Sequence, residues 1–242
     1  MRGGFLPLIF MAKELSFFKS NLYLPNLIDT FLFKHKQAKA NPERMPCDGI
    51  ICFCGEQGSG KTLSAVNYVY NLCKSYPKAW VCTNLSLTWD LDNHVIPYTG
   101  PEQMLSLDNE DYGIVFLLDE MHIEFNSLES KGMDVHIFEL VSQQRKSRKH
   151  IVGTSQVFGR LAKPFREQFK MAVCCDNYLG LIFRQQVFRA VNVADGEDIT
   201  VRLTPYAVKL FIPCPDDFGR YDTRQIIRRL RKDGFNSPRA IR

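Results

Sequence analysis

The chain has 242 residues, of which 45% are hydrophobic and 24% charged, which suffices for a well-buried core of one or two domains. These values exclude a disordered, collagen-like or disulfide-scaffold protein. The net charge is +5, but from Gly219 to the end eight Arg and Lys stand against two acids. Such a basic tail suits a polyanion, either nucleic acid or an acidic membrane surface, and a solvated helix face is the alternative.

Residues 1–46 are interpreted as an extension with a helix over 22–33 and a polar linker over 34–42. The apolar run over 5–12 is short, contains Pro7 and lacks a convincing cleavage site, so it predicts a packed or peripheral segment rather than a signal peptide. No apolar stretch reaches the roughly 18 residues that a membrane span needs. We therefore expect a cytoplasmic protein without a transmembrane helix, with a peripheral position at the inner face of the membrane as a further option.

The eight cysteines show no CxxC pair and no Cys/His spacing that fits a zinc site. Two of them, Cys52 and Cys54, alternate within an apolar strand. We expect small apolar packing residues in a reducing cytoplasm.

Residues 47–218 are predicted to form the core domain, and in its first part apolar runs alternate with helical patterns. This alternation predicts a mainly parallel sheet with helices on both faces, an α/β fold. The predicted strands are Gly49–Cys54, Ala79–Thr83, Ile114–Leu118 and Ile151–Thr154, and the predicted helices are Lys61–Tyr76 and Val135–Lys149.

The pattern changes in the second part of the core. Met171–Cys175, Leu181–Val193 and Ile199–Ile212 are strand-like and are separated by turn signals, which predicts an antiparallel hairpin added to the sheet. Residues 219–242 form the basic C-terminal tail, with a helix expected over Ile226–Leu230.

A phosphate-binding loop follows the first core strand and matches the pattern G-x-x-x-x-G-K-[ST]. Its glycines allow backbone N–H groups to surround a β-phosphate, and the following helix N-terminus favours negative charge. Lys61 is predicted to neutralise the β- and γ-phosphates and Thr62 to bind Mg²⁺. The predicted ATP-binding residues of the loop are Gly55, Glu56, Gln57, Gly58, Ser59, Gly60, Lys61 and Thr62.

Two acids, Asp119 and Glu120, end the strand Ile114–Leu118. Ligands gather at the carboxyl ends of parallel strands, so this pair is expected beside the phosphate loop. Asp119 is predicted to hold the hydration shell of Mg²⁺ and Glu120 to orient and polarise the attacking water. The pair favours ATP hydrolysis over phosphoryl transfer to a small acceptor, and a strand-end turn is the alternative.

A polar residue, Gln156, ends the predicted strand after the basic segment that holds Arg145 and Arg148. Gln156 is predicted to reach the γ-phosphate or its water, and a structural hydrogen bond is the alternative. Either arginine is a candidate for an arginine finger that enters a neighbouring subunit's site, and a solvated or nucleic-acid-facing role is the alternative. Asn84 is expected to line the site, whereas His122 lacks a metal-ligand partner at useful spacing.

Together these motifs, with the strand ending at Leu85, Arg166 and the late Tyr221-Asp222-Thr223, resemble the zonula occludens toxin-like (Zot-like) ATPases. That family resembles the larger FtsK–HerA class of DNA-pumping ATPases, in which an arginine, a histidine and a strand-end glutamine are spaced as Arg145, His150 and Gln156 are here. The resemblance covers roughly residues 49–223 and implies a RecA-like P-loop fold. One departure is that the phage assembly proteins of the family carry a transmembrane helix after the ATPase domain.

The leading hypothesis is therefore an ATP-driven motor for phage or virus assembly. It implies a homo-oligomeric ring of hexamer type that couples hydrolysis to DNA packaging or virion export, with the basic segments contacting DNA without reading its sequence. The alternative is a nucleotide-gated, non-motor assembly factor that binds coat or membrane-anchored partners. A third class, a small-molecule kinase, shares the phosphate loop but is disfavoured by the Asp119-Glu120 pair and Gln156.

Overall fold

The computed structural model describes residues 28–33, 36, 41–47, 49–109, 111–125, 148–161, 163–190 and 204–222. The chain divides into two compact units, Met1–Pro42 and Glu43–Arg242. In the first unit, residues 28–33 are helical, within the helix predicted over 22–33. The predicted helix Ile226–Leu230 and residues 135–147 of the predicted helix Val135–Lys149 lie outside the described residues.

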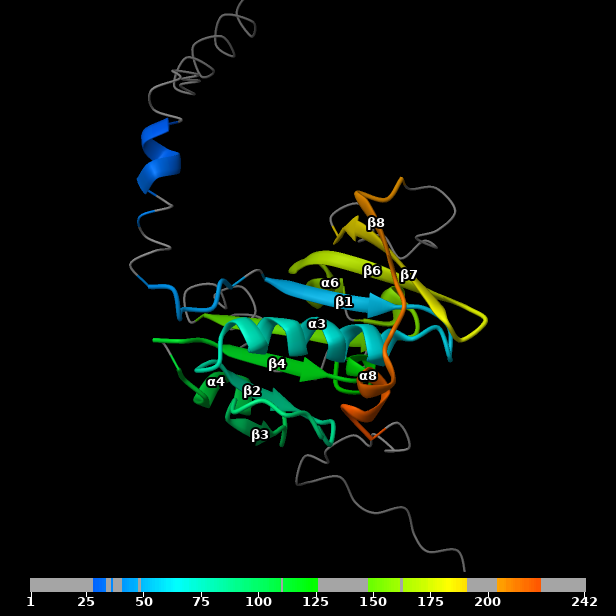
Figure 1. The fold of residues 1–242 in the computed structure, drawn as a ribbon, viewed down its shortest axis with the longest axis horizontal. Helices are drawn as coiled ribbons and strands as arrows, with labels where there is room; N and C mark the ends of the chain where they lie inside the picture. Colours follow the sequence, from blue (N-terminus) through cyan, green and yellow to red (C-terminus); the bar gives the residue numbers. More distant parts are fainter. Residues whose placement is uncertain are drawn as a thin grey trace, which may run out of the picture. The chain divides into compact units, whose positions relative to one another are not determined.

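The second unit is built on a sheet of eight strands in the order β3-β2-β4-β5-β1-β6-β7-β8 (Figure 1). The neighbours from β3 to β6 are parallel, and β7 and β8 are antiparallel additions. The predicted α/β fold with a mainly parallel sheet and an antiparallel hairpin is confirmed. The strands are β1 (Ile50–Cys54), β2 (Trp80–Thr83), β3 (Val95–Pro97), β4 (Ile114–Leu118), β5 (Lys149–Ser155), β6 (Phe169–Tyr178), β7 (Ile182–Arg189) and β8 (Ala207–Phe211). The helical segments are α3 (Lys61–Ser75), α4 (Gln103–Ser106), η1 (Met121–Ile123), η3 (Phe158–Arg160), α6 (Lys163–Arg166) and α8 (Pro215–Gly219).

The central strands β1, β4 and β5 are buried along their whole length, as expected for parallel strands covered on both faces. The strand β5 starts at Lys149, so the helix predicted to extend to that residue is wrong at its end. The physical reason is the satisfied ammonium group of Lys149, whose Nζ donates to the carbonyl oxygens of Met104 at 2.9 Å and Leu105 at 3.3 Å. These bonds allow a lysine to begin a buried strand.

The helix α3 covers one face of the sheet with side chains spaced three and four residues apart (Figure 1). Ala65, Val66, Val69 and Cys73 pack in one cluster with apolar residues of the central strands, among them Val115 of β4. Because β1 leads directly through a short loop into α3, this packing determines where the loop lies.

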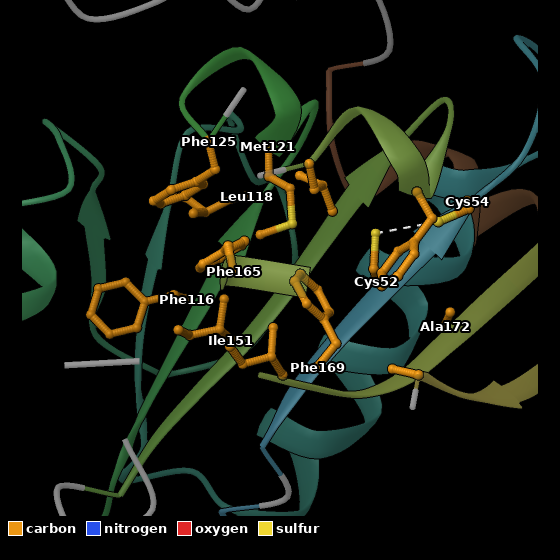
Figure 2. Packing of buried hydrophobic residues seen from close by; sticks show 14 of the residues in the cluster. Cys52, Cys54, Phe116, Leu118, Met121, Phe125, Ile151, Phe165, Phe169 and Ala172 are labelled. Carbon is orange, nitrogen blue, oxygen red and sulfur yellow. Dashed lines mark hydrogen bonds between the residues drawn. The ribbon is translucent and has the colours of Figure 1, made fainter. Parts of the chain in front are cut away.

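The opposite face holds an aromatic cluster (Figure 2). The rings of Phe125 and Phe165 stack with centroids 4.4 Å apart, and Phe169 meets Phe165 edge-on at 5.1 Å. Phe125 follows η1 closely, and Met121 within η1 is also fully buried. The cluster therefore anchors the turn that carries Asp119 and Glu120.

All eight cysteines lie within the described residues and are free thiols. Burial raises the pKa of Cys73, Cys82 and Cys175 to about 12 each. Thiols with such a pKa are inert at neutral pH, which agrees with the expected packing role.

The end of the described chain closes over α3 and the segment after β2. Thr88 N donates to the carbonyl of Arg220 at 2.8 Å, and Asp222 N donates to the carbonyl of Ser86 at 3.1 Å. Leu87 and Tyr221 form an isolated β-bridge. We call Pro215–Asp222 the C-terminal clasp.

At the N-terminal boundary of the second unit, Met45 is fully buried in the core. No helix in the described part of the chain has the length and apolar character needed to cross a membrane.

Candidate nucleotide site

Four parallel strands bring the predicted site residues to one edge of the sheet. β1 leads into Gly55, β2 into Asn84, β4 into Asp119 and β5 into Gln156. Since β5 lies between β1 and β4, these strand ends meet where ligands bind in α/β sheets.

The phosphate loop depends on glycine at positions where a side chain would collide with its neighbours. Gly60 has φ 82° and caps α3, and a Cβ there would lie 2.4 Å from the ring of Phe183. A Cβ on Gly55, with φ 149°, would lie 2.6 Å from the carbonyl oxygen of Cys175. In addition, Asn177 Nδ2 donates to the carbonyl of Gly58 at 3.1 Å. The β6–β7 hairpin thus supports the loop, a role of Phe183 and Asn177 that no local sequence signal reveals.

Lys61, the lysine of the loop, is buried, and its side chain contacts the backbone of the same loop. Its Nζ donates to the carbonyl of Glu56 at 3.0 Å, and Ser59 N donates to the same oxygen at 3.1 Å. Ser59 Oγ is buried without a hydrogen-bond partner among the described residues. A loop with a buried ammonium group and a buried, unsatisfied hydroxyl is suited to an anionic ligand.

The side chains of Thr62 and Asp119 meet across the two motifs. Thr62 Oγ1 donates to Asp119 Oδ1 at 2.8 Å, and Thr154 Oγ1 donates to the same oxygen at 2.7 Å. Hydroxyl and carboxylate oxygens are the ligands that Mg²⁺ prefers, usually one or two from the protein together with substrate phosphates. The described residues contain no group of three or more His, Cys, Asp or Glu that could hold a metal ion, and a magnesium site of this type needs none.

Asn84 holds the backbone of Asp119 from the end of β2. Its Oδ1 accepts from Asp119 N at 2.8 Å, and its Nδ2 donates to the carbonyl of Asp119 at 2.9 Å. The structure therefore brings Asn84 to the acid turn, and it does so through the backbone of Asp119 rather than by lining the loop.

Glu120 has a left-handed backbone with φ 50°, a conformation that costs free energy in a non-glycine residue and recurs at functional sites. Its N–H donates to Thr154 Oγ1 at 2.9 Å. The next residue, Met121, packs so closely on β5 that a Cβ at Gly153 would lie 2.4 Å from its sulfur. This packing holds the strained turn in place.

His122 lies beside the carboxylate of Glu120, with Nδ1 3.2 Å from Oε2. Burial lowers the pKa of His122, the charge of Glu120 opposes this, and the positive charges of Arg160 and Lys61 lower it further. His122 is therefore neutral at pH 7. The sequence analysis excluded His122 only as a metal ligand and did not connect it with Glu120.

Gln156 is half-buried and accepts a hydrogen bond on Oε1 from Arg160 Nη1 at 3.2 Å. Arg148 lies in the turn before β5, with φ 49°, and its carbonyl accepts from Ile114 N. The seven residues of β5 separate it from Gln156 by about 25 Å. Arg145 lies outside the described residues.

His150, which shares the family spacing with Gln156, is fully buried near the start of β5. Its Nδ1 lies 2.7 Å from the carbonyl oxygen of Gly49, and its Nε2 lies 3.1 Å from Tyr68 Oη. These contacts place it in the core, beneath α3 and away from the carboxyl ends of the strands.

No protein-family model matches the sequence, and no curated protein matches it by sequence comparison. Among solved structures, the chain is similar to the N-terminal domain of zonular occludens toxin from Neisseria meningitidis, at 14% identity and a TM-score of 0.49, over 72% of this chain and 98% of that one. It is also similar to the genome packaging NTPase B204 from Sulfolobus turreted icosahedral virus 2 in complex with ATP-gammaS, at 12% identity and a TM-score of 0.48, over 69% and 98%.

A third neighbour, a solved ATPase domain, matches at 8% identity with a TM-score of 0.51 over 84% of this chain and 99% of that one. At these identities the likeness concerns the fold. The fold predicted from the sequence, a P-loop ATPase fold, is confirmed.

Proposed function

We propose that this chain is an ATP-hydrolysing motor of the Zot-like, FtsK–HerA type that powers phage or virus assembly by DNA packaging or virion export. The observation that carries the proposal is the 2.8 Å bond between Thr62 Oγ1 and Asp119 Oδ1, with Glu120 on the same turn. It joins a phosphate loop, a magnesium-binding pair and a carboxylate for water within one edge of the sheet.

In this mechanism the backbone of the loop and the ammonium group of Lys61 bind the β- and γ-phosphates. Thr62 and Asp119 would hold Mg²⁺, which when bound neutralises charge on the phosphate oxygens. Glu120 orients the attacking water and accepts its proton. Gln156, released from Arg160, reports the presence of the γ-phosphate.

Ring assembly is part of the proposal. Arg148 lies at the far end of β5 from the site of its own subunit, so a finger role for Arg148 requires a neighbouring copy. Mixing an Arg145→Ala subunit with a Lys61→Ala subunit should then recover some hydrolysis, because one interface in the mixed ring is complete. A smooth loss of activity that follows DNA affinity and salt would instead make the arginines phosphate contacts.

One observation favours the alternative of a nucleotide-gated assembly factor for coat or membrane-anchored partners. The β6–β7 turn exposes Leu179 by 96%, and the edge strand β8 exposes Leu210 by 66%. Leu179 lies in the turn of the hairpin that supports the phosphate loop, and Leu210 lies on the strand paired with β7, so a partner bound there would contact elements tied to the nucleotide site.

ATP hydrolysis with and without DNA separates the two functions. A motor should release ADP and free phosphate without an added acceptor, and DNA should stimulate the rate in a salt-sensitive manner. A mass measurement in the presence of ATP tests the ring. Hydrolysis that ignores DNA at all salt concentrations would favour the assembly factor.

A further inference from the structure

The geometry points to His122 as a positioning residue that fixes the carboxylate of Glu120 for attack by water. This inference rests on the proposed function, because it assigns His122 a part in ATP hydrolysis. Its basis is the 3.2 Å separation of His122 Nδ1 from Glu120 Oε2, in a pair whose side chains are only 16% and 26% exposed.

The hydrogen bonds around His122 indicate which ring nitrogen carries the proton. Ser155 Oγ lies 3.5 Å from His122 Nδ1 and uses its own proton for the carbonyl of Val157 at 2.9 Å. Ser155 therefore meets His122 as an acceptor, as the carboxylate of Glu120 also does. Two acceptors on the same nitrogen require the proton on Nδ1.

The carboxylate of Glu120 needs such a donor. Its Oε2 is buried and lacks a well-aligned hydrogen bond among the described residues, although Nδ1 of His122 lies 3.2 Å away. The exposed surface of the Glu120 side chain therefore belongs to its other atoms and not to Oε2. A small closing movement would turn the contact into a hydrogen bond and leave the other oxygen, Oε1, for water, since hydrogen bonds in catalytic sites often tighten only when substrate is bound.

Packing of the neighbouring residues fixes the turn that carries His122. His122 is the middle residue of η1 and directly follows the fully buried Met121. Phe125, which comes shortly after η1, stacks on Phe165. The ring therefore moves with the turn that carries Glu120. A side chain that stands on a packed turn and is directed at a catalytic carboxylate keeps that carboxylate in its productive orientation.

Three variants of His122 distinguish positioning from packing. The side-chain amide of asparagine places an N–H group close to the location of Nδ1, whereas the amide of glutamine places it close to the location of Nε2. His122→Asn should keep most of the hydrolysis rate, whereas His122→Gln and His122→Ala should lower kcat about 10- to 100-fold, the range of one hydrogen bond to a charged group. Affinity for a nonhydrolysable ATP analogue should stay unchanged in all three.

The measurements are steady-state kcat and KM, analogue affinity and melting temperature for the full chain and each variant. Equal rates for His122→Asn and His122→Gln, or a parental rate for His122→Ala, would overturn the inference while leaving the ATPase proposal intact. A wild-type chain that binds the analogue but hydrolyses no ATP would instead overturn the proposed function. A loss of rate that follows the melting temperature alone would make His122 a packing residue.

Discussion

The two sides of the candidate nucleotide site are built differently. On the phosphate side, which comprises Lys61, Thr62 and Asp119, the side chains already form hydrogen bonds of 2.8–3.0 Å with one another or with the loop. On the hydrolytic side the members are Glu120, His122, Gln156 and Arg160. There Glu120 Oε2 has no hydrogen-bond partner among the described residues, and Gln156 is paired with Arg160.

This difference separates binding from chemistry. Under the proposed function, the phosphate side receives the nucleotide on groups that already lie close together. Under the same proposal, the hydrolytic side releases Gln156 from Arg160 and closes His122 on Glu120 before water is activated. We therefore expect nucleotide binding to be a property of the single chain, and hydrolysis to respond strongly to changes around Glu120.

The largest effect is expected from Glu120→Gln, which keeps the shape of the side chain and removes its basicity. Hydrolysis should fall about 10²- to 10⁴-fold, the usual contribution of a general base, while ATP affinity stays near the parental value. Single-turnover hydrolysis and equilibrium binding measure the two quantities. Glu167→Gln, at an exposed position, is the matched control. A Glu120→Gln chain that hydrolyses at the parental rate would place the base elsewhere.

Lys61→Ala should affect the opposite side. Loss of the buried ammonium group should weaken ATP binding about 10- to 100-fold, the value of one hydrogen bond to a charged group, and leave the fold intact. Binding is measured by calorimetry and the fold by circular dichroism. Lys74→Ala removes an exposed lysine from the last turn of the same helix and should bind ATP normally. Undiminished affinity in Lys61→Ala would contradict the phosphate-loop assignment.

Thr154→Val tests the contact between the phosphate side and the hydrolytic side, which meet at the hydroxyl of Thr154. The hydroxyl of Thr154 donates to Asp119 Oδ1 and accepts from Glu120 N, so its removal leaves Asp119 Oδ1 with Thr62 as its hydroxyl donor and takes this acceptor away from Glu120 N. The free energy of unfolding should fall by about 1–3 kcal/mol, and both magnesium-dependent binding and hydrolysis should weaken. Chemical denaturation and the two activity assays measure this, and Thr154→Ser should restore all three. If only one side responds, the two sides are not coupled through this hydroxyl.

The phosphate side could be predicted from the sequence because each of its members belongs to a local pattern. The loop pattern identifies Lys61 and Thr62, and the end of a continuous apolar strand identifies Asp119. Asn84 was also placed near the acid turn, since the ends of parallel strands share one edge. The fold was predictable for the same reason: buried strands and an amphipathic helix leave strong periodic signals.

The remaining contacts depend on distant parts of the chain. Thr154 acquires its role only when β5 lies beside β4, and Phe183 reaches Gly60 only through the hairpin. No spacing in the sequence encodes these pairs. The start of β5 was predicted wrongly because the buried Lys149 is stabilised by carbonyl oxygens more than 40 residues away, which local propensity cannot reveal.

The smallest effect is expected from Arg220→Ala in the C-terminal clasp. The guanidinium carbon of Arg220 lies 3.4 Å from the ring centroid of Tyr70, and its Nη1 donates to Asn67 at 3.1 Å and pairs with Asp217. These contacts hold the clasp against α3. Loss of this planar stacking should lower the melting temperature by a few degrees.

Its effect on the site should be indirect and weaker than that of Thr154→Val. The backbone carbonyl of Arg220 accepts from Thr88 N, four residues beyond the Asn84 that holds Asp119. A loosened clasp should therefore disturb the magnesium side slightly and leave the orientation of Glu120 unchanged. The expected signature is a small rise in the magnesium concentration needed for half-maximal hydrolysis, with kcat at saturating magnesium near the parental value. Arg220→Lys, which keeps the charge without the planar group, should reproduce much of the thermal loss. A lower kcat at saturating magnesium would instead show that the clasp reaches the hydrolytic side.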